Sequence, residues 1–328
     1  MSKPLIYLCI LLLLFFLELL YFRIADRLNI IDEPNDRSSH TKTTIRGGGI
    51  IFSLAAFLWF AYSDFSYPYF ITGLILIAAI SFIDDVTTLK SSIRSVVHLL
   101  AVSLLLYQLN LNLTWFWFPL IMILVIGTIN AYNFMDGING ITGGYSLVVL
   151  ATLFFVNRYI LMFTSETLMV SSLLSLLVFN FFNFRKKAKC FAGDVGSVSI
   201  AFIICFILIQ LIAQTGNLLF LALLLIYGLD AVTTIIFRLI RKENIFEAHR
   251  SHFYQYLANE RGLPHLGVSI MYAVLQSLIN IAVIYACPLG SDFFESLWIL
   301  LAGIVFSGLV FVGIRLALEG KKRLFGVG

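Results

Sequence analysis

The chain has 328 residues, of which 60% are hydrophobic and only 12% are charged, and its mean hydropathy is +0.96. A soluble globular protein of this length needs more polar surface than this composition provides, so that class is excluded. The net charge of +4 is modest and does not indicate a nucleic-acid surface, so we expect no nucleic-acid partner. The composition instead predicts an integral membrane protein.

Apolar runs that are long enough to cross roughly 30 Å of hydrocarbon recur about eleven times. They lie near residues 5–22, 47–63, 69–83, 96–109, 115–131, 145–163, 167–184, 198–213, 218–240, 266–287 and 295–315. The first run contains Glu18 and leads into Arg23 without a small-residue cleavage site, so we expect a retained helix rather than a signal peptide. We predict an all-α polytopic membrane bundle of about 11 helices that forms one domain over residues 1–328.

The basic residues predict the orientation of this bundle. Twenty of the 22 Lys and Arg residues fall in alternate loops or at the ends of the runs beside them, and only Lys3 and Arg158 lie elsewhere. The positive-inside rule places those loops in the cytoplasm, with the N-terminus outside and the C-terminus inside. The loops on the other side are only a few residues long, so we expect any sizeable polar site on the cytoplasmic side.

Two adjacent carboxylates, Asp84 and Asp85, close the third apolar run. They repel one another unless a cation or a proton relieves them. Adjacent helical residues also point to different sides, so one carboxylate can face a metal or a reacting group while a loop holds the other. A solvated helix end is the simpler alternative.

A second polar group ends the fifth run, where Asn130, Asn133 and Asp136 are spaced i, i+3, i+6. Amides and a carboxylate on one face of a membrane helix are costly to leave unpaired, which favours contact with a metal or a ligand. The Asp136-Gly and Asn139-Gly pairs are also typical of turns. Turn formation alone does not explain Asn130 and Asn133.

The segment Gly193-Asp194-Val-Gly196-Ser197 opens the eighth run. Glycines permit close backbone approach, and the free N–H groups at the start of a helix attract phosphate. Asp194 would repel such a phosphate unless a divalent cation lay between them. A plain helix N-cap is the alternative.

Two further loops carry Arg and His residues that can bind phosphate oxygens through charge-assisted hydrogen bonds. One holds His249 and His252, and the other holds Arg37 and His40 and leads to Arg46 before three glycines. The first loop could equally anchor lipid headgroups, and the second could be a simple polar connection.

Four motifs therefore follow one another at the expected inner helix ends: Asp84-Asp85, Asn130-x-x-Asn133-x-x-Asp136-Gly-x-Asn139-Gly, Gly193-Asp194-x-Gly196-Ser197 and His249-x-x-His252. Together they resemble the polyprenyl-phosphate N-acetylhexosamine-1-phosphate transferase family, also called glycosyltransferase family 4. That family includes enzymes that initiate enterobacterial common antigen and O-antigens, and phospho-N-acetylmuramoyl-pentapeptide transferase. The resemblance runs from about Asp32 to Gln255.

This chain departs from the family pattern at three positions. Thr88 stands where some relatives have a third acid or a lysine, so a third carboxylate role is not expected there. Thr43 and Ile45 replace prolines that often precede the glycines, which alters the stiffness of the loop rather than its chemistry.

The resemblance implies an enzyme that transfers N-acetylhexosamine 1-phosphate from a UDP-sugar to undecaprenyl phosphate and releases UMP. It implies Mg²⁺, or Mn²⁺ in its place, and a bacterial inner membrane location with the active site facing the cytoplasm. It also implies initiation of O-antigen, lipopolysaccharide or a related cell-envelope glycan, and it admits a homodimer. The loops around Arg37 and His249 look most like those of enzymes that transfer a 6-deoxy sugar such as N-acetylfucosamine or N-acetylquinovosamine.

The same resemblance suggests roles for individual residues. The implied metal ligands are Asp194, Asn133 and Asp136. The implied catalytic residues are Asp84, Asp85, Asp136, His249 and His252, the first two acting on the lipid phosphate and the histidines on pyrophosphate. The implied substrate-binding residues are Asn139 and Phe191 at the uracil, Arg250 at the pyrophosphate, and Asn130, Arg37, His40 and Arg46.

Two other classes remain as alternatives. An ion-coupled transporter could use the intramembrane polar residues Glu18, His98, Asp230 and Arg238. Transporters gather such groups near the midplane on broken helices, whereas most acids here cluster at inner helix ends, which favours an enzyme. A phosphatidyltransferase that uses a CDP-activated alcohol would need a run of spaced aspartates on adjoining helices, which this sequence lacks.

Overall fold

The computed structural model describes residues 3–33, 43–245, 249–286 and 293–326. Each of the eleven predicted apolar runs forms a helix or a pair of consecutive helices, so the prediction of an all-α polytopic bundle is confirmed. In the described part of the chain, ten of these segments are long and apolar enough to cross a membrane, and α2 is shorter. The segments are α1 (Lys3–Arg27), α2 (Ile50–Tyr62), α3 (Pro68–Val86), α4 (Ser91–Leu109), α5 (Trp117–Met135), α6 (Ile141–Tyr159), α7 (Glu166–Asn183), α8 (Gly193–Thr215), η1 (Leu218–Leu224) with α9 (Leu225–Ile240), α11 (His265–Ala286) and α12 (Phe293–Glu319).

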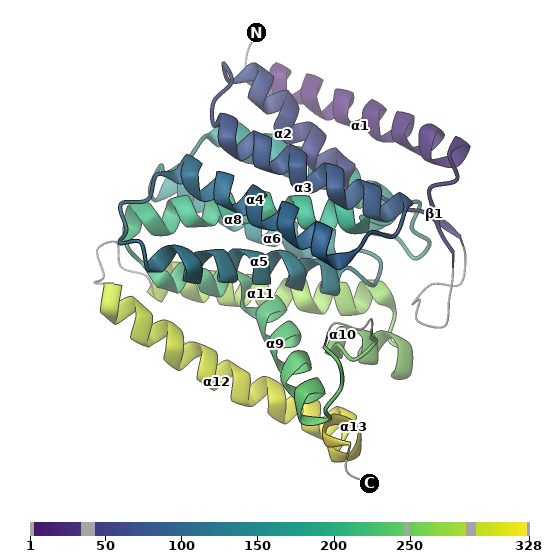
Figure 1. The fold of residues 1–328 in the computed structure, drawn as a ribbon, viewed down its shortest axis with the longest axis vertical. Coiled ribbons are helices and arrows are strands. Elements are labelled where there is room, and N and C mark those ends of the chain that lie inside the picture. Colours follow the sequence, from purple (N-terminus) through teal and green to yellow (C-terminus); the bar gives the residue numbers. More distant parts are fainter. Residues whose placement is uncertain (1–2, 34–42, 246–248, 287–292, 327–328) are drawn as a thin grey trace.

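Helix α8 lies at the centre of the stack (Figure 1) and packs against α2, α3, α5 and α6. After Asp194 its sequence has no charged residue, and apolar side chains surround the helix on every side. A helix that is apolar all round is stable only when it is buried all round. The position of α8 therefore fixes where its polar first turn lies, at the end of the bundle that carries the basic loops.

The predicted run 218–240 is not one straight helix. It starts as the 3₁₀ segment η1 and continues as α9, which runs across the direction of the other helices (Figure 1). The side chain of Gln276 on α11 bridges the break, because its amide donates to the Ala222 carbonyl at 3.0 Å and its oxygen accepts the Ile226 N–H at 3.0 Å. Backbone groups freed inside a membrane bundle need such partners.

Short elements gather at the end of the bundle that carries the basic loops. Strands β1 (Ile31–Asp32) and β2 (Thr44–Ile45) pair antiparallel, with Ile31 opposite Ile45. Ile45 also bridges to Cys190 in the loop before α8. The one-turn helix α10 (Phe253–Gln255), the π-helical turn η2 (Tyr256–Glu260) and α13 (Lys321–Phe325) follow α9 and α12, and β1, α10 and α13 lie toward the same side of the stack (Figure 1).

The topology of the two helix ends can be tested by cysteine labelling in a variant without the native cysteines. We expect single cysteines at Ser91, Lys187 and Lys322, all exposed at the basic end, to react with an impermeant maleimide only after the cells are opened. Cysteines at Ser66 and Asn110, exposed at the opposite end, serve as matched controls and should react in intact cells. The reverse labelling pattern would invert the predicted orientation.

Candidate active site

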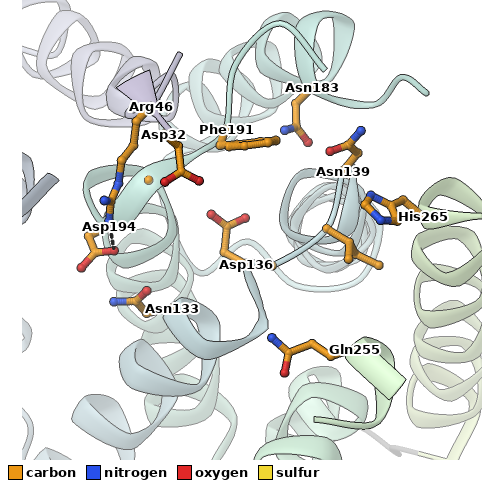
Figure 2. A pocket seen from close by; sticks show the side chains of 13 residues that line it. Asp32, Arg46, Asn133, Asp136, Asn139, Asn183, Phe191, Asp194, Gln255 and His265 are labelled. Atoms are coloured by element: carbon orange, nitrogen blue, oxygen red, sulfur yellow. Dashed lines mark hydrogen bonds and ion pairs between the residues drawn. The ribbon is translucent and has the colours of Figure 1, made fainter. Parts of the chain in front are cut away.

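Residues of two predicted motifs, 130–139 and 193–197, line one cavity of about 200 Å³ at the end of the bundle that carries the basic loops (Figure 2). Its walls come from β1, the residue that follows β2, the ends of α5 and α7, the start of α8, α10 and the start of α11. The lining residues are Asp32, Arg46, Asn133, Asp136, Gly137, Ile138, Asn139, Asn183, Phe191, Gly193, Asp194, Gln255 and His265.

A backbone junction joins the glycine loop 47–49 to the start of α8 next to the cavity, whose lining includes Gly193. Gly48 N–H donates to the Phe191 carbonyl at 2.9 Å, and Gly49 N–H donates to the Ala192 carbonyl at 3.1 Å. A Cβ on Gly49 would lie only 2.3 Å from the Cα of Gly196, so the two chains touch through glycine backbones. Gly193 has φ +71° and meets Gly47, which only glycine accommodates without strain.

The carboxylate of Asp85 holds the first turn of α8. It is buried, and it accepts the Asp194 N–H at 2.9 Å and the Val195 N–H at 3.0 Å. These N–H groups have no partner within α8, and the positive end of the helix favours a carboxylate there. Arg46 Nε completes the arrangement at 2.7 Å from Asp85 Oδ1. The structure therefore places Asp85 beneath the cavity, where it supports Asp194 and Arg46.

Asp84, the other member of the pair, points toward α4. Its Oδ1 accepts the Leu89 N–H at 2.7 Å and its Oδ2 lies 2.5 Å from Arg94 Nη1. The same Arg94 atom lies 3.4 Å from Asp194 Oδ2, while Arg46 Nη2 lies 3.5 Å from Asp194 Oδ1. Two half-buried guanidinium groups thus flank one carboxylate. The sequence analysis predicted that Arg46 binds substrate. It counted Arg94 only among the basic residues that predict the orientation of the bundle.

The end of α5 contributes further side-chain oxygens to the cavity. Figure 2 shows Asn133 beside Asp194, and Asp136 facing the middle of the cavity. Burial, and then the negative charges of Asp194 and Asp85, raise the pKa of Asp136 to about 7. Asn130, the third residue of the predicted stripe, is exposed and is not among the residues that line the cavity.

Phe191 and two amides form another wall. The Phe191 ring lies along the cavity next to Asn183, opposite Gln255 (Figure 2). The Asn139 amide nitrogen donates to the Arg185 carbonyl at 2.9 Å, so this group fixes the loop before α8. Asn183, which sequence reasoning missed, donates to the Cys190 carbonyl at 2.8 Å and accepts the Gly140 N–H at 2.8 Å.

The residues predicted from the histidine motif lie beside the cavity rather than in its wall. Of this segment, the described cavity is lined by Gln255, and not by His249, Arg250 or His252. The rings of His249 and His252 stack at 5.0 Å and approach Phe134. Burial and then the nearby His252 lower the pKa of His249 to about 4, so its ring is neutral at pH 7.

Some site residues could not be found or placed from the motifs. His265, at the start of α11, and Asp32, at the end of β1, line the cavity, but neither was assigned a role from the sequence. Arg37 and His40, which were assigned one, lie outside the described residues.

The chain matches known transferases over most of this region. Residues 67–212 match the family model for glycosyl transferase family 4. The probable undecaprenyl-phosphate N-acetylglucosaminyl 1-phosphate transferase of Bacillus subtilis is 24% identical over 278 residues, which cover 77% of this chain and 76% of the relative. The undecaprenyl-phosphate alpha-N-acetylglucosaminyl 1-phosphate transferase of Salmonella typhi is 26% identical over 212 residues, 57% of each chain. The phospho-N-acetylmuramoyl-pentapeptide-transferase of Halalkalibacterium halodurans is 30% identical over 96 residues, 28% of each. These matches confirm the family resemblance that the motifs predicted.

The close contact between Gly49 and Gly196 can be tested by adding one methyl group, as in Gly196→Ala. A Cβ on Gly196 would lie 2.6 Å from the Cα of Gly49, and backbone cannot move aside as a side chain can. We expect Gly196→Ala to lower the free energy of unfolding by about 1–3 kcal/mol or more, measured as a lower thermal unfolding temperature in detergent. Gly303→Ala on exposed α12, where nothing lies within 4 Å, is the control and should be neutral or stabilising. Equal losses in the two variants would contradict the close approach.

The pKa of Asp136 predicts how cation binding depends on pH. Below a pKa of about 7 the carboxyl is protonated, so a divalent cation must displace a proton in order to bind. We expect the affinity for Mn²⁺, followed by electron paramagnetic resonance, to rise up to about tenfold per pH unit below 7 and to level off above it. Asp136→Asn should flatten this part of the curve, and Asp64→Asn at the far end should not change it. An affinity that is constant between pH 6 and 8 would contradict the assignment.

Proposed function

We propose that this chain transfers an N-acetylhexosamine 1-phosphate from a UDP-sugar to undecaprenyl phosphate, with release of UMP. One observation carries the proposal: Asp136, Asp194 and Asn133 face one cavity beside Arg46, at one end of a membrane bundle. Two of the relatives named above are undecaprenyl-phosphate N-acetylglucosaminyl 1-phosphate transferases by name. A lipid phosphate and a membrane surface are therefore the expected acceptor and setting.

The electrostatics of the cavity suit a reaction between two polyanions. Both substrates carry phosphate, and catalysis of phosphoryl transfer consists mostly of positioning and charge stabilisation. Arg46 and Arg94 supply planar guanidinium groups that can bind phosphate oxygens in pairs. The carboxylates between them would repel phosphate in the absence of a cation.

The donor set also fits a hard divalent cation. Asp194, Asp136 and Asn133 offer carboxylate and amide oxygens, which Mg²⁺ prefers, and we propose them as its ligands. Among the described residues no group of three or more His, Cys, Asp or Glu side chains converges as a metal site, and Mg²⁺ commonly completes its shell with water and substrate phosphates. When bound, the cation would neutralise the pyrophosphate and stabilise the leaving UMP.

The chemical step forms one P–O bond and breaks another. An oxygen of undecaprenyl phosphate attacks the sugar-bearing phosphorus of the donor, and the bond from that phosphorus to the bridging oxygen breaks, so UMP leaves with the electron pair. A phosphate monoester is largely ionised near pH 7, because its second pKa is about 6, so the attacking oxygen needs little help from a base. We therefore assign Asp85 to positioning, consistent with its contacts to Asp194 and Arg46, and Asp84 to holding Arg94.

The opposite wall suits the nucleotide. We assign the Phe191 ring to stacking on uracil, and Asn139 to the shape of the loop that presents this ring. Gln255 and His265 are then left facing the sugar. The relatives' names favour an N-acetylglucosaminyl donor, whereas the loop resemblance favours a 6-deoxy sugar, and initiation of O-antigen or a related glycan follows from either.

Purified protein in nanodiscs with undecaprenyl phosphate and Mg²⁺ tests this proposal. We expect a UDP-N-acetylhexosamine from a panel that includes N-acetylglucosamine and 6-deoxy donors to yield UMP and a lipid-linked pyrophosphate sugar, both followed by mass spectrometry. Asp194→Asn should lower the rate by at least about a hundredfold, because it removes a charged ligand at the reacting centre.

Glu166→Gln is the matched control for that variant. It breaks an ion pair with Arg158 at the far end of the bundle and should leave the rate unchanged. UMP release that does not depend on the lipid, or an Asp194→Asn variant as active as the parent, would refute the proposal. Uptake of a solute without UMP release would favour a transporter.

A further inference from the structure

A buried carboxylate outside the cavity organises the segment that follows α9. Asp230 on α9 has no exposed surface. Hydrogen-bonding groups converge on its two oxygens: Phe253 N–H at 2.9 Å, Tyr254 N–H at 3.1 Å, the Tyr272 hydroxyl at 2.6 Å, the Thr234 hydroxyl at 3.2 Å and His252 Nδ1 at 3.2 Å. A charge in the interior of a membrane bundle is costly, so such complete partnering indicates a dedicated role.

Asp230 fixes the start of α10, together with the pairing of His252 and Gln255. This helix has three residues, and one turn of helix is not stable alone. The carboxylate accepts the N–H groups of the first two of those residues, Phe253 and Tyr254. The segment 252–255 is therefore held by a side chain from α9 in addition to its own bonds, such as that from the Tyr256 N–H to the His252 carbonyl at 3.0 Å.

That segment touches the cavity at two places. Gln255 lines it directly, and its side-chain oxygen accepts the His252 N–H at 3.4 Å. The Tyr254 hydroxyl donates to the Phe134 carbonyl at 2.9 Å, at the end of α5. A Cβ on Gly137 would lie 2.2 Å from that hydroxyl, so Tyr254 supports the turn that presents Asp136. Figure 2 shows Asp136 and Gln255 on neighbouring walls of the cavity.

A second buried charge holds the same segment from the other side. Arg315 on α12 donates to the Ser251 carbonyl at 2.9 Å and to the hydroxyls of Thr233 at 3.0 Å and Thr234 at 2.9 Å. Thr234 in turn donates to Asp230. The last long helix is thus tied to the loop that precedes α10, although most of α12 is exposed.

We propose that Asp230 is a positioning residue for the transfer reaction, which sets Gln255 and the Asp136 turn through the segment His252–Gln255. The proposal rests on the proposed function. Arg46, which we assign to phosphate binding, is held by Asp85, and Phe191, which we assign to uracil, lies on the wall of the cavity opposite Gln255. Loss of Asp230 should therefore lower kcat more than it raises KM for the donor.

Asp230→Asn tests the proposal with little change of shape. An amide has one acceptor oxygen, so in either orientation its NH₂ group faces a backbone N–H of Phe253 or Tyr254. We expect faster hydrogen exchange in the peptide that covers residues 252–257, and a kcat lower by about ten- to a hundredfold, with KM for the UDP-sugar within about threefold. Glu166→Gln, the far-end control, should change neither quantity.

Tyr254→Phe provides a second test if Asp230→Asn fails to fold. It removes only the hydroxyl that reaches Phe134, so kcat should fall by about three- to tenfold while exchange at residues 252–254 stays protected. A full kcat in Tyr254→Phe, or faster exchange without a loss of kcat in Asp230→Asn, would overturn the proposal. If the parent protein releases no UMP with any donor, the proposed function fails, and unchanged exchange in Asp230→Asn would then refute the link to the segment independently.

Discussion

The whole site depends on one contact, the carboxylate of Asp85 at the start of α8. Helix α8 is buried on all sides, so the N–H groups of its first turn can reach water only through the cavity. By accepting two of them, Asp85 ties α3 to α8 and fixes the direction in which Asp194 points. The same carboxylate anchors Arg46, which directly follows β2. Segments far apart in sequence meet at one helix end because a negative charge is stable there.

Most helices could be predicted from the sequence, because a membrane-spanning helix needs a long run of apolar residues. The break between η1 and α9 could not, since it depends on Gln276 from another helix. The β1–β2 pair has two residues per strand, too few for a periodic signal. The predictions of domain organisation, metal and homodimer remain predictions.

Some residues of the candidate site could be predicted from the sequence and others could not, for physical reasons. Residues three apart on a helix differ by about 60° in direction. The side chains of Asn130, Asn133 and Asp136 at the end of α5 therefore do not all point to the same side. Asn133 and Asp136 therefore reach the cavity while Asn130 does not. Gln255 and His265 belong to the site only through tertiary packing, and nothing in their neighbours distinguishes them from ordinary loop residues. Some of the intramembrane polar residues that favoured the transporter alternative have structural partners nearby. Arg238, for example, pairs with Glu243 and donates to the Asn244 carbonyl at the end of α9.

The glycine junction has a consequence for how such a site can change over time. Where Gly49 meets Gly196, two backbones touch and no side chain is available to be exchanged, so this part of the cavity is closed to variation. The wall formed by Gln255 and His265 consists of side chains on separate short segments, which can be replaced without moving a helix. Sequence change around the cavity, in nature or by engineering, is thereby directed to that wall, while the glycine junction stays constant.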